Sequence, residues 1–381
     1  MRIKELDGLR FFAIFSVFLV HYRPSPARAL DFMALGWAGV DLFFAISGFL
    51  ITGILVRMRT ESHPFRTFYW RRFLRIFPPY YSAFAIILVL AIAHHEVIPR
   101  LDAFESATFL SSLDLGYSFS TVWARLFGHA AFGSAAASIV CPRFPFFWNG
   151  LGVFWSLSVE EMFYLLWAPV ILKGSRRAIL LFSVVPLIAC PVLRALTHTT
   201  SYPELFSFIC RFDSLAAGGC VALAFVAVER QTLSVATLRR VLLTAIPVST
   251  VLLLILIWRC GFFQGIELRT TTAFSIFGYT LLAILFAALT GACSHWTGSI
   301  TTGALRLRPL TYLGQISYSM YLIHIPAYVA AGILLELWIG PNATLQAVLA
   351  IACTIVVSSL SWKYFERPIL RLRDKSLAAH A

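Results

Sequence analysis

Charged residues are scarce in this sequence. Asp, Glu, Lys and Arg together make up 13% of the 381 residues, whereas 59% are hydrophobic. A soluble domain carries about twice that charged fraction, so the scarcity excludes an ordinary soluble domain. Apolar runs long enough to cross a bilayer recur along the chain. The net charge is +13, and such an excess in a membrane protein is typical of cytoplasmic loops and does not indicate nucleic-acid binding.

Cysteine is also sparse and lacks any recognisable pattern. The seven cysteines show no CxxC pair and fall mostly within or at the ends of apolar runs. Packing is the favoured interpretation, which argues against a disulfide framework. We therefore predict no metal site. Internal repeats, low-complexity tracts and a soluble domain are absent as well.

The apolar runs predict an all-α, polytopic bundle of about ten spans. We expect one integral-membrane domain over residues 1–370, with an external loop at about 94–147 and a short cytoplasmic tail at 371–381. The expected spans are 9–23, 38–56, 76–93, 152–172, 178–193, 206–228, 241–258, 272–292, 311–335 and 344–365.

The distribution of Lys and Arg predicts that both termini are cytoplasmic. With ten spans and the N-terminus inside, the inner segments hold 22 of the 31 basic residues, as the positive-inside rule requires. An eleventh span at 121–140 would invert the later loops and place Arg125 and His129 in the membrane. Residues 9–23 are interpreted as a retained first helix and not as a signal peptide, because Asp7, Arg10 and His21 interrupt or flank the apolar run.

Two ionisable residues in the first span share one helix face. Arg10 and His21 are eleven residues apart, which is close to three full turns and about 16.5 Å along the axis. That distance excludes direct contact. Ionisable groups in spans usually face a cavity or one another. The plainer alternative remains open: Arg10 pairs with Asp7 and reaches the interface, and His21 lies at the opposite interface.

The second span adds a carboxylate and small residues. Asp41 lies at the outer start of this span and is expected to reach His21, where it would fix the imidazole tautomer. Ser47 is expected to line a cavity. Gly48 permits close approach of another helix.

Further candidates for a polar cavity occur in the fourth, sixth and ninth spans. Glu160 and Glu161 point about 100° apart on one helix and cannot play the same role. An internal ion pair with Asp213 is the alternative for Arg211. In the ninth span the candidates are Tyr321 and His324, and a buried histidine is more often a hydrogen-bonded core residue.

A basic cluster precedes the third span in the segment FYWRRFLRIFPPYY. Arg71, Arg72 and Arg75 stand at i, i+1 and i+4, so Arg71 and Arg75 share a face. Such clusters commonly anchor a protein at the cytoplasmic interface. Clustered guanidinium groups also bind phosphates, so we predict a phosphate site here.

Six motifs occur in the order seen in one known family. They are LDGLRFFAIFSVFLVHY, GVDLFFAISGFLIT, RRFLRIFPPYY, FWSLSVEEMFYLL, RFDSLAAG and SYSMYLIHIP, followed by the ending YFERP. The chain thus resembles the membrane acyltransferase-3 family, the bacterial O-acyltransferases of surface polysaccharides and glycosides. Met162 departs from the family pattern, in which glutamine is common. No esterase-like domain follows the bundle, so we expect no relay to a fused domain.

The resemblance implies transfer of an acyl group, usually acetyl, from cytoplasmic acyl-CoA to a hydroxyl of a cell-surface polysaccharide or lipid-linked sugar. It implies a location in the bacterial inner membrane, acyl-CoA as co-substrate and no bound cofactor. The expected partners are acyl-CoA, a carbohydrate acceptor and membrane lipids.

The implied roles divide the candidates into three groups. His21 would act as general base or accept the acyl group itself, with Asp41 and Arg10 assisting. The three clustered arginines would bind acyl-CoA. The expected cavity and acceptor residues are Ser47, Glu160, Arg211, Tyr321 and His324. Two alternatives remain: a proton-coupled transporter or flippase, and an acyltransferase for a small glycoside such as a macrolide sugar or a lipochitooligosaccharide.

Overall fold

The computed structural model describes residues 3–22, 28–93, 151–197, 207–262, 271–295 and 299–371, with the single residues 108 and 268. The predicted external loop and the rejected span at 121–140 lie outside the described residues apart from Thr108. All but the first residue of the predicted tail lie outside them too, so the loop and the tail stay predictions.

The described part of the chain is helical and contains no strand. In chain order the elements are α1 (Lys4–His21), η1 (Arg28–Trp37), α2 (Ala38–Met58), α3 (Pro64–Ala93), η3 (Leu151–Phe154), α7 (Trp155–Lys173), α8 (Arg176–Thr197), α9 (Phe208–Glu229), α10 (Val235–Arg259), η7 (Phe274–Gly278), α11 (Tyr279–His295), α12 (Ile300–Gly303), η8 (Ala304–Arg306), α13 (Arg308–Gln315), α14 (Ser317–Trp338), α15 (Ala343–Ser361) and η9 (Trp362–Glu366).

Within the described ranges, eight helices are long and apolar enough to cross a membrane. This confirms a multi-pass membrane protein. Each of the ten predicted spans coincides with a helix, but α1 and α7 are not among the eight. Both carry ionisable side chains, notably Arg10 in α1 and Glu160 in α7. The predicted number of ten spans is therefore not confirmed.

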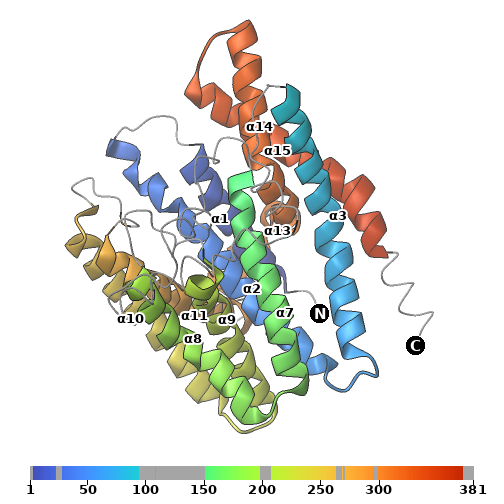
Figure 1. The fold of residues 1–381 in the computed structure, drawn as a ribbon. Helices are drawn as coiled ribbons and strands as arrows, with labels where there is room; N and C mark the ends of the chain where they lie inside the picture. The colour runs from blue at the N-terminus through green and yellow to red at the C-terminus, as the bar shows by residue number, and fades with distance from the viewer. Residues whose placement is uncertain are drawn as a thin grey trace, which may run out of the picture.

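The helices form two groups around a central set (Figure 1). Helices α8, α9, α10 and α11 pack together on one side, and α14 packs against α15 and α3 on the other. Helices α1, α2 and α7 lie between them, and α2 packs along both α1 and α9. The central position explains why α1 and α2 have many buried residues. Several of their polar side chains, among them Asp7, Asp41 and Thr52, are therefore buried within the protein.

Close packing of α2 against α9 depends on two glycines. A Cβ atom at Gly48 would lie 1.9 Å from the Leu215 carbonyl oxygen, and one at Gly218 would lie 2.1 Å from the Ala45 carbonyl oxygen. No larger side chain fits at that separation. The predicted role of Gly48 in close helix approach is thus confirmed.

Two predicted boundaries were wrong. Helix α3 starts at Pro64, so the arginine cluster lies on a helix and not in a loop. The helix continues through Pro78 and Pro79, and prolines of this kind are tolerated in membrane helices. The predicted ninth span is divided at Ile316 into α13 and α14.

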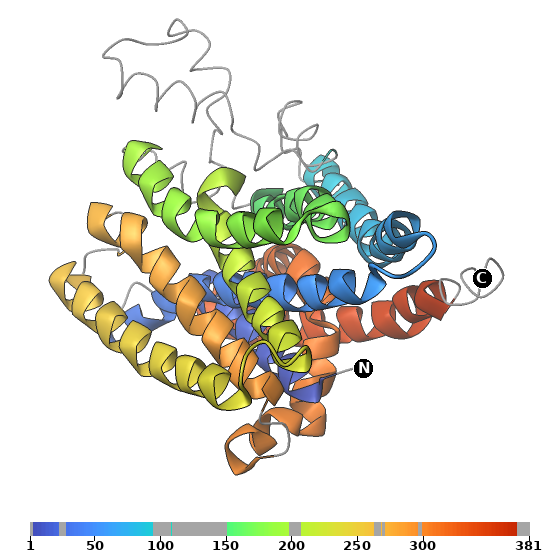
Figure 2. The same cartoon turned by 90° about the horizontal axis from the view of Figure 1, so that it is seen from below.

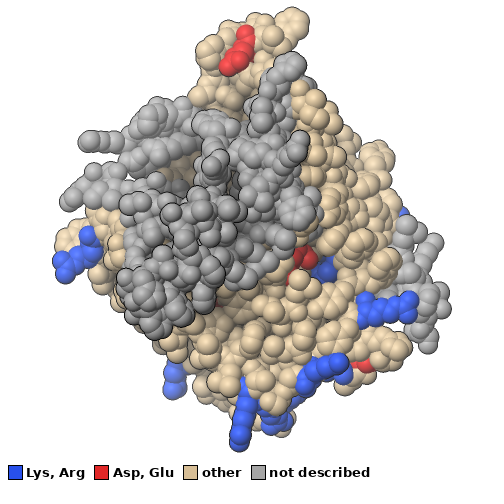
Figure 3. Space-filling view, viewed as in Figure 1, with Lys and Arg blue, Asp and Glu red and all other residues tan. Residues whose placement is uncertain are grey.

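The start of α1, the α2–α3 connection and the end of the helical segment after η9 lie at the same end of the molecule (Figure 2). Basic side chains gather along the lower edge of the face in Figure 3, on the side where the α2–α3 and α7–α8 connections lie. This arrangement agrees with the positive-inside count. The cytoplasmic location of the termini stays a prediction.

Candidate functional site

Two adjoining cavities enter the bundle between α1, α3 and α14. The wide cavity has a volume of about 680 Å³, and the narrow cavity has a volume of about 80 Å³. Arg10, Arg75 and Tyr318 line both. The two cavities therefore adjoin at these three residues, and together they are called the path.

The narrow cavity brings together six of the predicted site residues from five helices. These residues are Arg10, Ser47, Arg72, Arg75, Glu160 and Tyr321. Arg10 keeps an ion pair with Asp7 at 3.4 Å. The plainer interpretation of Arg10 is thus correct as far as its partner goes, and the same side chain lines both cavities.

Glu160 is the acceptor at the centre of the narrow cavity. The hydroxyls of Ser47 and Tyr164 both donate to its Oε1 atom. Glu161 lines neither described cavity, as expected for a residue that points about 100° away. A single carboxylate oxygen thus links α2 and α7.

The arginines of α3 that line the cavities are not the two that the spacing predicted to share a face. The Arg72 guanidinium lies over the Phe68 ring at 5.8 Å and the Tyr164 ring at 5.4 Å, and Arg75 reaches both cavities. Arg71 lines neither cavity. The i, i+3 pair of Arg72 and Arg75, and not the predicted i, i+4 pair with Arg71, therefore faces the path.

Tyr321 lines the narrow cavity and is fixed by two contacts of its hydroxyl. Its hydroxyl is 2.7 Å from the Ser156 hydroxyl and donates to the Val153 carbonyl at 3.0 Å. One turn further along α14 lies His324, which is completely buried. The side chains of His21 and His324 line neither cavity, but the His324 ring lies next to the Tyr321 ring, with their centroids 5.5 Å apart.

His21 and His324 form a hydrogen-bonded pair. His324 Nδ1 lies 2.6 Å from the Tyr321 carbonyl oxygen and therefore carries the proton. In neutral His324 the Nε2 atom is then an acceptor, and it lies 3.2 Å from His21 Nδ1. His21 Nδ1 also lies 3.0 Å from the Val17 carbonyl oxygen. Both contacts place the His21 proton on Nδ1, so Nε2 carries the lone pair of the neutral ring.

The expected partner of His21 was wrong. Asp41 is completely buried, and its Oδ1 atom accepts from Arg211 at 2.7 Å and from the Ser214 hydroxyl at 2.9 Å. Among the described contacts no bond joins Asp41 to His21. His324, predicted only as a cavity residue, occupies the orienting position instead.

Arg211 does form an internal ion pair, as the alternative interpretation expected, but its partner is Asp41 and not Asp213. Asp213 pairs with Arg194 at 3.0 Å and accepts from the Thr280 hydroxyl at 2.7 Å. The Arg211 guanidinium lies 3.8 Å from the centre of the Tyr279 ring. Arg211 lines neither described cavity, and it joins α2 to α9 in the bundle interior.

Sequence reasoning missed several residues of this network. Arg194 is not among the predicted site residues, yet it is fully buried and also donates to backbone carbonyls of α9 and η7. Tyr164 was not singled out either. Its position one turn after Glu160 was the available signal, since residues four apart meet on one helix face.

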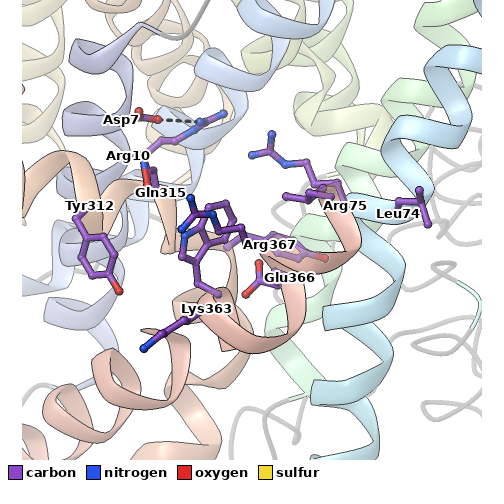
Figure 4. Close-up of a pocket in the computed structure, with 12 residues that line it drawn as sticks. Asp7, Arg10, Leu74, Arg75, Tyr312, Gln315, Lys363, Glu366 and Arg367 are labelled. Atoms are coloured by element: carbon purple, nitrogen blue, oxygen red, sulfur yellow. Dashed lines mark hydrogen bonds and ion pairs between the residues drawn. The ribbon is translucent and has the colours of Figure 1, made fainter. Parts of the chain in front are cut away.

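The wide cavity is lined by four cations and two carboxylates. The cations are Arg10, Arg75, Lys363 and Arg367, and the carboxylates are Asp7 and Glu366. Figure 4 shows Arg10 and Arg75 extending toward one another from α1 and α3. Like charges that converge in this way form a natural anion site.

The fold and this path together define a class of multi-pass membrane protein. A family profile described as the acyltransferase domain matches residues 3–363. The chain therefore belongs to the acyltransferase-3 family of multi-pass membrane proteins.

The chain is similar to several bacterial O-acetyltransferases. It is 28% identical to the peptidoglycan O-acetyltransferase OatA of Listeria monocytogenes, over 96% of this chain and 56% of the relative. It is 27% identical to the putative peptidoglycan O-acetyltransferase YrhL of Bacillus subtilis, over 96% and 55%, and 24% identical to the O-acetyltransferase OatA of Staphylococcus aureus, over 99% and 58%. The chain thus spans little more than half the length of these relatives. No solved structure matches the chain.

Proposed function

We propose that the protein is a membrane O-acetyltransferase that moves an acetyl group from cytoplasmic acetyl-CoA to a hydroxyl of an envelope glycan in the bacterial cytoplasmic membrane. Family membership supports the reaction class. The similarity to peptidoglycan O-acetyltransferases supports a peptidoglycan-like acceptor. The observation that carries the proposal is the polar path, which narrows from the cations of the wide cavity to Tyr321, next to the histidine pair.

The path matches the parts of an acyl-CoA in their chemical order. The phosphates would bind Arg10 and Arg75 where the two cavities meet. The thin pantetheine arm would enter the narrow cavity past Ser47 and Glu160. The thioester would then arrive beyond Tyr321, within about 16.5 Å of Arg10 along α1.

His21 would be the general base. Its Nε2 atom would take the proton of the acceptor hydroxyl while the hydroxyl oxygen attacks the thioester carbonyl. The tetrahedral intermediate would expel the CoA thiolate, which takes the proton from the imidazolium. The products are the acetyl ester and CoA thiol, and neutral His21 is restored.

The test is acetyl transfer by purified protein in liposomes, measured with radiolabelled acetyl-CoA and peptidoglycan fragments. Loss of the base is expected to lower the rate by about 10²- to 10⁴-fold in His21→Ala. His63→Ala is the matched control, because His63 is exposed in the α2–α3 connection. Wild-type protein that neither transfers nor hydrolyses acetyl-CoA would favour a carrier, and normal turnover by His21→Ala would remove His21 from the chemistry.

A further inference from the structure

The segment after α15 forms one wall of the wide cavity. It starts as the π-helical turn η9 (Trp362–Glu366) and continues as helix to Arg371. Trp362, Lys363, Glu366, Arg367 and Leu370 from this segment line the cavity. Short π-helical turns within longer helices are frequent at functional sites.

Glu366 holds this segment in place, and with Asp7 it offsets only part of the charge of the four cations that line the cavity. The hydroxyls of Ser319 and Ser361 donate to its Oε1 atom at 2.6 and 2.9 Å, and the residue is only 8% exposed. The first bond ties η9 to α14, and the second closes the π-helical turn. The carboxylate is thus committed to positioning the wall.

Three cations of the wide cavity, Arg75, Lys363 and Arg367, remain available for an anion. Asp7 is committed to Arg10, and Glu366 to the two serines. Within the described residues Arg75 and Arg367 make no hydrogen bond or ion pair with the protein, and Lys363 has only a contact with the Tyr364 ring at 4.9 Å. Figure 4 shows Arg367 extending into the space near Arg10 and Arg75. Such converging cations are stabilised by a bound anion.

The volume of the wide cavity and the aromatic side chains that line it favour a nucleotide as ligand. Pockets for small molecules have volumes of about 300–1,000 Å³, and the wide cavity has about 680 Å³. Tyr312, Tyr318 and Trp362 line it and offer aromatic surface for a base. Lys363 and Arg367 line only the wide cavity, whereas Arg10 and Arg75 also line the narrow one.

We propose that Lys363 and Arg367 bind the 3′-phosphate of the acyl-CoA donor and thereby select it over donors that lack this group. The inference rests on the proposed function and follows from the order of the cavities. A donor with its arm in the narrow cavity places its diphosphate at Arg10 and Arg75. Its adenosine 3′-phosphate then lies in the wide cavity, at the wall that Lys363 and Arg367 form.

The experiment measures dissociation constants of CoA and 3′-dephospho-CoA for the purified full-length chain in uncharged detergent, by calorimetry. Wild-type protein is expected to bind CoA about tenfold more tightly, since two partly exposed charge pairs contribute about 1 kcal/mol or less each. Lys363→Ala/Arg367→Ala should bind both ligands equally. Lys363→Arg/Arg367→Lys should retain the preference. Arg371→Ala is the matched control, because Arg371 is exposed on the same helix and does not line the cavity.

The outcomes separate this inference from the function on which it rests. Wild-type protein that binds neither ligand would overturn both. A tenfold preference that survives in Lys363→Ala/Arg367→Ala would overturn the inference alone. A double variant that no longer binds added phosphatidylglycerol in the calorimeter, but binds CoA as wild-type protein does, would assign the wall to a lipid headgroup. That result would overturn the inference too.

Discussion

Replacement of His324 tests whether it assists His21 in catalysis, and a double-mutant cycle distinguishes this role from a purely structural one. His324→Phe keeps a buried ring of similar size but removes the acceptor for His21 Nδ1, which lies 3.2 Å away. His21 keeps its contact to the Val17 carbonyl at 3.0 Å. The loss is therefore one neutral hydrogen bond of about 1 kcal/mol, and kcat should fall about fivefold.

The assay is a double-mutant cycle on acetyl transfer. If His324 acts through His21, the double variant His21→Ala/His324→Phe should be no slower than His21→Ala. Residues in contact are expected to show such non-additive effects. The KM for acetyl-CoA should not change, because neither histidine lines the cavities. His63→Phe serves as the control for an exposed histidine.

One result would refute this reasoning. A further fivefold loss in the double variant, relative to His21→Ala, would mean that His324 contributes independently of His21. His324 would then hold α14 in place or contact the acceptor, and the tautomer assignment for His21 would lose its catalytic meaning.

Three further predictions concern the path and the packing around it. Arg75→Ala should raise the KM for acetyl-CoA about fivefold. Arg71→Ala should leave the KM unchanged, since Arg71 lines neither cavity. Equal effects of the two substitutions would mean that the arginine cluster only anchors the protein at the membrane interface. Gly48→Ala should destabilise the protein by about 3 kcal/mol in detergent denaturation, but Gly53→Ala on the same helix should not, because its Cβ would meet only a flexible side-chain atom at 3.5 Å. Arg194→Met should lower the unfolding free energy by about 3–5 kcal/mol, because it leaves the buried carboxylate of Asp213 without its cation. An unchanged melting temperature would contradict a structural ion pair.

The sequence predicted which residues meet far better than it predicted which atoms bond. Apolar runs located the helices, and the cost of a charge in lipid required the ionisable residues to converge. Arg10, Glu160 and Tyr321, which are far apart in the chain, do line one cavity. The motif resemblance gave the family, which the profile match confirms.

Partner choice depended on packing that the sequence does not encode locally. Successive residues on a helix point about 100° apart, so the rotation of α3 decides whether Arg71 or Arg72 faces the path. The glycine contact between Gly48 and α9 likewise brings Asp41 to Arg211, out of reach of His21. These outcomes are set by contacts between helices distant in sequence.

The most direct test of the path is to find where the acyl end of the donor rests. A short-chain acyl-CoA with a diazirine in its acyl group would be photolysed on the reconstituted protein, and the labelled peptides mapped by mass spectrometry. We predict labelling of α14 at Tyr321 to His324 and of α1 near His21, abolished by excess acetyl-CoA. Labelling confined to other helices, or unaffected by acetyl-CoA, would contradict the path.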